Sequence, residues 1–60
     1  MADLDDIRTR LEGIAEELTE HAIELLREAV EAGADKRPEM EKRVTRARAG
    51  IEKAARLLAE

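Results

Sequence analysis

The sequence predicts an all-α fold, an antiparallel two-helix hairpin that dimerises into a four-helix bundle. Three observations support this prediction. Apolar residues recur at steps of three and four in two segments of the 60-residue chain, and a single cluster of helix-breaking residues separates the segments. The chain also holds too few large apolar residues for a core of its own. We therefore expect residues 1–60 to form one helical hairpin domain.

The first helix is expected over about residues 3–32. Asp3 can cap it, and Asp5 with Asp6 suits the positive end of the helix dipole. Gly33 can end it, because a glycine just past the last apolar position readily adopts the left-handed conformation of a C-terminal cap. Eight apolar positions at helical spacing share one face of this helix. They are Leu4, Ile7, Leu11, Ile14, Leu18, Ala22, Leu25 and Ala29.

A turn over residues 33–37 precedes the second helix, which is expected over about residues 38–59. Pro38 suits the first helical position, and Glu39 with Glu41 favours the start of the helix. The turn has the length of an αα-hairpin connection, so the two helices should run antiparallel. Six apolar positions are expected to face the first helix. They are Met40, Val44, Ala47, Ile51, Ala54 and Leu58.

The composition indicates that one hairpin cannot build an adequate core. Apolar residues make up 43% of the chain, but eleven of them are alanine, only fifteen are large aliphatics and none is aromatic. The absence of cysteine excludes disulfides and thiolate metal sites. A chain of this size rarely gains more than about 3–5 kcal/mol from its own core. We therefore expect self-association to complete the fold.

The surface expected to bind a partner holds apolar residues that one neighbouring helix cannot cover. Leu4 and Ile7 should extend beyond the shorter second helix, and Ile23 with Val30 lies beside the main apolar stripe. Gly50 marks a shallow flank where a partner helix can approach closely. The partner is expected to be a second copy of the chain or another helical protein. The residues expected in self-association are Leu4, Ile7, Leu11, Ile23, Val30, Gly50 and Leu57.

Charge is divided between the two expected helices. Residues 1–35 carry a net charge of −8 and residues 36–60 a net charge of +4, for a total of −4. Arg43 and Arg48 are expected to reach acids of the first helix, which would orient the two helices. The negative total disfavours binding to anionic lipid. The chain opens on an acidic segment and has no long apolar run, so we expect a cytoplasmic protein.

His21 is the sole histidine, and it lies at the edge of the apolar stripe. Together with Glu17 one turn before it and Glu24 one turn after it, His21 is a weak candidate for a divalent metal site. The Glu-x-x-His motif of di-metal bundles would require a glutamate where this chain has Leu18. We favour a boundary histidine that donates to a neighbouring carboxylate, and we expect no metal and no other cofactor.

Four bases fall together on the outer face of the second helix and could bind phosphate groups. They are Lys42, Arg46, Lys53 and Arg56. In size and topology the expected hairpin resembles the Rop-like RNA-binding dimers, and this resemblance implies a nucleic-acid-associated bundle. The chain has no aromatic side chain that could stack on bases. A solvated charged face is the alternative interpretation, and it is the one we favour.

The spacing of residues 7–18 is similar to the opening helix of the all-helical chorismate mutases. Continued without gaps, this resemblance places Gly33 at the turn glycine of that family and Lys36 and Arg48 at two of its substrate-binding cations. It implies that these two residues, with Arg8, would hold a dicarboxylate substrate. The third helix of that family has no counterpart in this chain.

Residues 41–48 and 51–54 resemble small uncharacterised helical proteins of actinobacteria, a resemblance that implies no activity. The sequence contains no nucleophilic triad and no glycine-rich phosphate loop. We therefore expect a non-enzymatic, self-associating helical hairpin that acts as a protein interaction or scaffolding module. Rop-like binding of nucleic acid and a chorismate-mutase-like activity are the alternatives.

Overall fold

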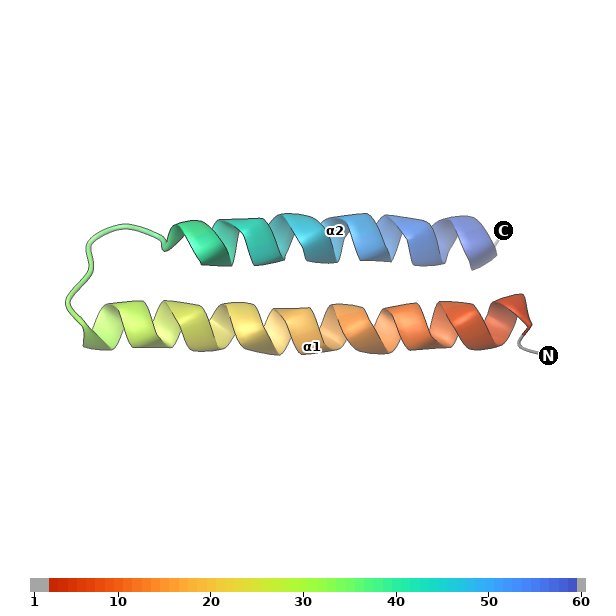
Figure 1. Cartoon of the computed structure of the whole chain (residues 1–60), viewed down its shortest axis with the longest axis horizontal. Coiled ribbons are helices and arrows are strands. Elements are labelled where there is room, and N and C mark those ends of the chain that lie inside the picture. Colours follow the sequence, from red (N-terminus) through yellow and green to blue (C-terminus); the bar gives the residue numbers. More distant parts are fainter. Residues whose placement is uncertain (1–2, 60) are drawn as a thin grey trace.

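The structure, a computed structural model, describes residues 3–59 and consists of two helices joined by a loop. Helix α1 spans Leu4–Glu31 and helix α2 spans Glu39–Ala59. They lie side by side and antiparallel, so the start of α1 and the end of α2 share one end of the hairpin (Figure 1). The predicted all-α hairpin is confirmed, and both helices begin and end within one residue of their expected bounds.

Both ends of α1 are capped by the residues that the sequence indicated. Asp3 accepts a hydrogen bond from the backbone amide three residues further on, at 2.8 Å from its Oδ1. Gly33 has a φ of +80°. Its amide donates to the carbonyl of Val30 (3.0 Å), and the amide of Ala34 donates to the carbonyl of Ala29 (2.9 Å). These two bonds form a Schellman motif, which ends the helix and starts the turn.

The contact between the helices is lined by small side chains. Its buried apolar residues are Ala15, Ala22 and Ala55, which are 5%, 9% and 4% exposed. Within residues 3–59 no leucine, isoleucine, valine or methionine side chain is buried. Alanines let two helices approach closely but remove little apolar area from water. The hairpin therefore lacks a core of large side chains.

The contact with α1 lies along one edge of the apolar stripe of α2. Met40 and Ala47, which were expected to face α1, are exposed. Their neighbours Glu41 and Arg48 take the inner positions: Glu41 is buried, and Arg48 Nη1 donates to Thr19 Oγ1 of α1 at 3.3 Å. The prediction was wrong at these two positions because the stripe is wider than a single neighbouring helix, which can contact it along an edge.

Helix α1 is longer than α2 and extends beyond it mainly at the loop end (Figure 1). The sequence had predicted that this extension would lie at the amino end and include Leu4 and Ile7. Leu4 is indeed 60% exposed, but Ile7 is half-buried, and Val30 near the loop is the more exposed residue at 74%. The loop of residues 32–38 takes up the difference in length.

Candidate functional site

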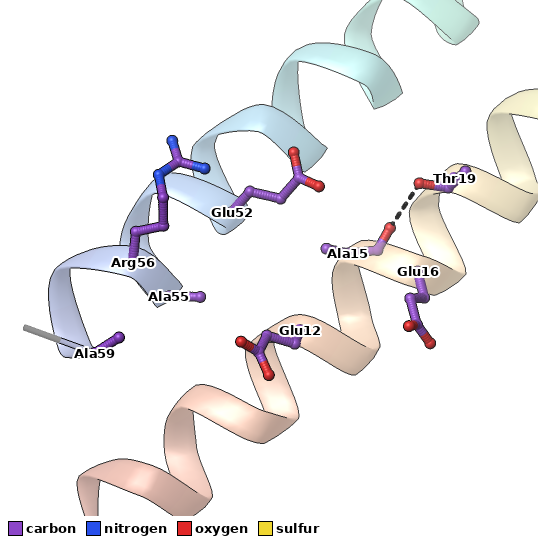
Figure 2. A pocket seen from close by; sticks show the side chains of 8 residues that line it. All are labelled: Glu12, Ala15, Glu16, Thr19, Glu52, Ala55, Arg56 and Ala59. Carbon is purple, nitrogen blue, oxygen red and sulfur yellow. Dashed lines mark hydrogen bonds between the residues drawn. The ribbon is translucent and has the colours of Figure 1, made fainter.

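A groove lined by polar side chains and alanines occupies one face of the hairpin. It has a volume of about 500 Å³ and is bounded by both helices. In Figure 2, Ala15 and Ala55 point toward one another, Glu12 points toward α2 and Arg56 points away from α1. The hydroxyl of Thr19 is turned back to donate to the carbonyl of Ala15 (3.1 Å). The lining residues are Glu12, Ala15, Glu16, Thr19, Glu52, Ala55, Arg56 and Ala59.

The opposite face of the hairpin is apolar on both helices. Successive residues of an α-helix are about 100° apart, so Ile14 and Leu18 flank the buried alanines of α1 on the side away from the groove. On α2, Met40, Ala47 and Ala54 occupy the same side. We define the apolar face as the residues that share this side or border the helix contact. They are Ile7, Leu11, Ile14, Leu18, Leu25, Met40, Val44, Ala47, Ile51, Ala54 and Leu58.

The apolar face is open to water in the single chain. Ile14 is 43% exposed, Met40 is 51% exposed, and the other large side chains of this face are half-buried. On both helices the contact between α1 and α2 lies beside the apolar stripe and not at its centre. This offset is typical of half of a four-helix bundle, in which each helix contacts two neighbours and its stripe points between them.

Four of the seven residues predicted for self-association lie on or beside the apolar face. Ile7 and Leu11 belong to it. Gly50 lies along its outer edge on α2, and Leu57, one heptad further on and 63% exposed, continues that edge. A Cβ added at Gly50 would meet nothing within 4 Å in the single chain. Leu4 lies at the exposed amino end of the helix contact itself.

The remaining two predicted residues lie on the groove side. Ile23 follows Glu16 by seven residues, or about two helical turns, and therefore lies on the same side of α1 as this groove residue. Val30 follows Ile23 by a further two turns. Ile23 is 52% exposed, and Val30 lies where α1 extends beyond α2. The seven predicted residues thus do not form one continuous surface.

The carboxylate of Glu41 lies at the centre of a polar cluster that was not predicted from the sequence. Arg37 donates to it from Nε and from Nη2 (3.0 Å), and Thr45 Oγ1 donates at 2.6 Å. The Arg37 hydrogen bonds, followed by the Thr45 hydrogen bond, lower the pKa of Glu41 from 4.5 to about 2. The sequence feature that could have predicted this cluster is the spacing of its members. Arg37 and Thr45 lie four residues to either side of Glu41, which is about one helical turn away.

The weak metal candidate is not assembled by one chain. Glu17 and His21 line a shallow hollow together with Ile14 and Leu18 at the edge of the apolar face. Among residues 3–59, however, no three carboxylate, imidazole or thiol groups are grouped so that they could hold a metal ion. Glu24, the third candidate ligand, therefore does not complete a site with Glu17 and His21.

The four bases predicted to bind phosphate share one side of α2, because steps of four, seven and three residues return to the same side of a helix. Lys42, Arg46 and Lys53 lie on the outer side of α2, and Arg56, which points away from α1, also borders the groove (Figure 2). Lys42 also forms an ion pair with Glu39 at 3.5 Å. Part of the positive charge is thus neutralised within the helix.

The cross-helix ion pairs expected for Arg43 and Arg48 do not form. Within the described residues every ion pair joins two residues of one helix or joins the loop to α2. Arg48 lies 3.9 Å from Glu52 of its own helix, and its contact with α1 is the hydroxyl of Thr19. Arg43 is exposed at the outer edge of the apolar face. Rotation of α2 relative to the predicted contact explains the difference.

The three cations that the chorismate mutase resemblance singled out lie far apart in one hairpin. Arg8 pairs with Asp5 in the first turns of α1 (3.6 Å), Lys36 lies in the loop, and Arg48 contacts Thr19 near the middle. The eleven residues from Arg8 to Thr19 alone span about 16 Å of helix. A single chain does not bring these cations around one small substrate.

Comparison of the chain with protein-family models, with curated proteins and with solved structures finds no match in any of the three. The resemblances to Rop-like dimers, to chorismate mutases and to actinobacterial hairpins therefore stay predictions. Within residues 3–59 no helix is both long enough and apolar enough to cross a membrane.

Proposed function

We propose that this chain is a non-enzymatic helical module that self-associates through its apolar face. Two copies would form a four-helix bundle and serve as a protein interaction or scaffolding unit. One observation carries the proposal: the apolar stripes of α1 and α2 face the same side of the hairpin, beside the helix contact, while the largest buried apolar side chains are alanines.

A second copy fits this face in size and shape. The hairpin measures 48 × 15 × 13 Å between its Cα atoms. One broad face therefore projects about 700 Å², close to the roughly 800 Å² that each partner buries in a stable interface. In a two-fold dimer the apolar face of each copy covers the apolar face of the other. Two-fold dimers are also the commonest symmetric assemblies of soluble proteins.

Dimerisation would supply the core that the hairpin lacks. Full burial of a large aliphatic side chain contributes roughly 1.5–3 kcal/mol relative to full exposure, so a half-buried side chain still has roughly 1 kcal/mol to gain. Ile14, Leu18 and Leu25 on α1 and Met40 and Ile51 on α2 would each gain in this way. Together these five side chains would gain roughly 5 kcal/mol.

A matched pair of substitutions tests the proposal. Ile14 and Ile23 belong to the same helix and are 43% and 52% exposed, but nine residues of helix place them on opposite sides of α1. Ile14→Glu should raise the dissociation constant of the dimer at least tenfold, or about 1.4 kcal/mol, in sedimentation experiments. Ile23→Glu should change it less than twofold.

Two results would contradict the proposal. Equal effects of Ile14→Glu and Ile23→Glu would show that the apolar face is not the interface. If the parent chain sediments as a monomer, the proposal of self-association is wrong, and the apolar face would then be available to a different helical protein.

A further inference from the structure

We infer that the two copies join with their loops at the same end, so that α1 of each copy lies beside α2 of the other. This inference rests on the dimer proposed above. Two symmetric arrangements bring the apolar faces together. With the two-fold axis parallel to the helices, the loops share one end and unlike helices meet. With the axis across the helices, the loops lie at opposite ends and like helices meet.

The outer edge of the apolar face is acidic on α1. Glu17, Glu24 and Glu28 lie along it and are exposed. Glu24 pairs only with Arg27 of its own helix (3.4 Å), and no base of the described residues lies within ion-pair distance of Glu17 or Glu28. Arg10, a base on this edge, is paired within its own helix (3.8 Å). This edge therefore presents net negative charge.

The outer edge of the apolar face is basic on α2. Arg43 lies along it, Arg46 and Lys53 lie beyond it on the outer side of α2, and all three are exposed. Within residues 3–59 no carboxylate lies within 4.0 Å of their charged nitrogens. A small hollow lined by Glu39, Arg43 and Arg46 shows that two of these bases lie together. The hairpin thus has one acidic and one basic edge, and its own fold does not bring them into contact.

The register of the hairpin aligns these edges in the same-end arrangement. Thr19 and Arg48 lie at one level, because their side chains meet at 3.3 Å. Glu24 follows Thr19 by five residues and Arg43 precedes Arg48 by five, so Glu24 and Arg43 also share a level in antiparallel helices. An axis parallel to the helices keeps every residue at its level. Glu24 of one copy would therefore lie opposite Arg43 of the other.

The opposite-end arrangement would instead place like charges together. It sets α1 against α1 and α2 against α2, although residues 1–35 carry a net charge of −8 and residues 36–60 a net charge of +4. Exposed ion pairs contribute little energy each, but like-charge contacts at an interface select against an arrangement. Charge therefore decides between two arrangements that bury the same apolar face.

A spin label in the loop measures the arrangement directly. The chain has no cysteine, so Ala34→Cys introduces a single labelling site on an exposed loop residue. In the same-end arrangement, pulsed electron resonance should give a distance within about 25 Å, because bundle helices lie 8–10 Å apart. A distance near the 48 Å length of the hairpin would overturn the inference while leaving the dimer intact. A labelled chain that sediments as a monomer would instead overturn the dimer itself.

Charge reversal provides a second test that does not involve the loop. Arg43→Glu with Arg46→Glu should raise the dissociation constant at least fivefold at low salt, and adding Glu24→Arg with Glu28→Arg to the same chain should restore it. In the opposite-end arrangement the first pair of changes would relieve repulsion between the two α2 helices. Tighter association of the Arg43→Glu, Arg46→Glu chain would therefore contradict the same-end arrangement.

Discussion

The guanidinium of Arg37 holds both carboxylate oxygens of Glu41, although Arg37 lies in the loop and Glu41 is a buried residue in the first turn of α2. Thr45, one turn further along the helix, donates to the same carboxylate. The cluster ties the end of the loop to the start of α2. It also satisfies a carboxylate that would otherwise be costly to bury.

The Glu41 cluster predicts a loss of stability in acid. The pKa of Glu41 is lowered from 4.5 to about 2 in the folded chain, mainly by its hydrogen bonds from Arg37. The resulting stabilisation is fully present above about pH 4.5 and is lost as the pH falls through about 2. Thermal melts from pH 6 to pH 2 should therefore fall less steeply for Glu41→Gln than for the parent chain.

The exposed neighbour Glu39 provides the control for this titration. Its side chain is 80% exposed and pairs with Lys42 in the same helix. Glu39→Gln should leave the acid dependence of the melting temperature close to that of the parent. Parallel pH profiles for the parent chain and Glu41→Gln would refute the role assigned to the cluster.

Substitution by alanine should change the stability of the fold in opposite directions at Gly33 and at Gly13. Gly33 has a φ of +80°, which costs a residue with a Cβ about 1–2 kcal/mol, so Gly33→Ala should destabilise the fold by about that amount. Gly13 lies within α1, and a Cβ there would meet nothing within 4 Å. Gly13→Ala should stabilise the fold by up to about 1 kcal/mol through helix propensity. Denaturant unfolding of both variants measures these changes, and a stabilising Gly33→Ala would contradict the turn geometry.

The helices and their caps could be predicted because their determinants are local. Asp3 and Gly33 act on backbone groups within one or two turns, and the apolar spacing needs no knowledge of the neighbour. The orientation of α2 could not be predicted in the same way. Helix α1 could pack against either edge of the apolar stripe that includes Met40 and Ala47. The spacing of apolar residues is the same in both cases, so it does not indicate which edge α1 contacts.

The burial of Glu41 was missed for a related reason. A carboxylate in the first turn of a helix is ordinarily placed in water, where it favours the helix dipole. Its inner position follows only once Arg37 and Thr45 are counted as donors one turn to either side, and once α2 is rotated to bring Glu41 inward. The rotation of α2 also decides which of its residues lie on the groove side and which lie on the apolar face.

Replacing Gly50 with alanine tests whether the proposed partner packs closely against this edge of α2. In the single chain a Cβ at Gly50 meets nothing within 4 Å, as at Gly13, so the hairpin alone should gain equally from alanine at either position. If the other copy packs against this edge, the added methyl group should reduce or reverse the gain. We expect Gly13→Ala to raise the melting temperature and Gly50→Ala not to raise it. Equal gains would exclude a close contact at Gly50.

The outer side of α2 is expected to bind phosphate weakly. Lys42 is paired with Glu39, Arg56 borders a groove lined by glutamates, and the chain as a whole carries a net charge of −4. A phosphate-bearing resin should therefore not retain the chain at physiological ionic strength. Retention that disappears in a chain with Lys42→Glu and Lys53→Glu would contradict this expectation and favour the Rop-like alternative.

The dependence of folding on protein concentration tests the central claim most directly. Sedimentation equilibrium and circular-dichroism melts of the unmodified chain, over a hundredfold range of concentration, report its mass and its stability together. Because an association that completes the core follows mass action, we predict twice the chain mass and a melting temperature that rises with concentration. A chain that sediments at its own mass, with one melting temperature at every concentration, would contradict the account.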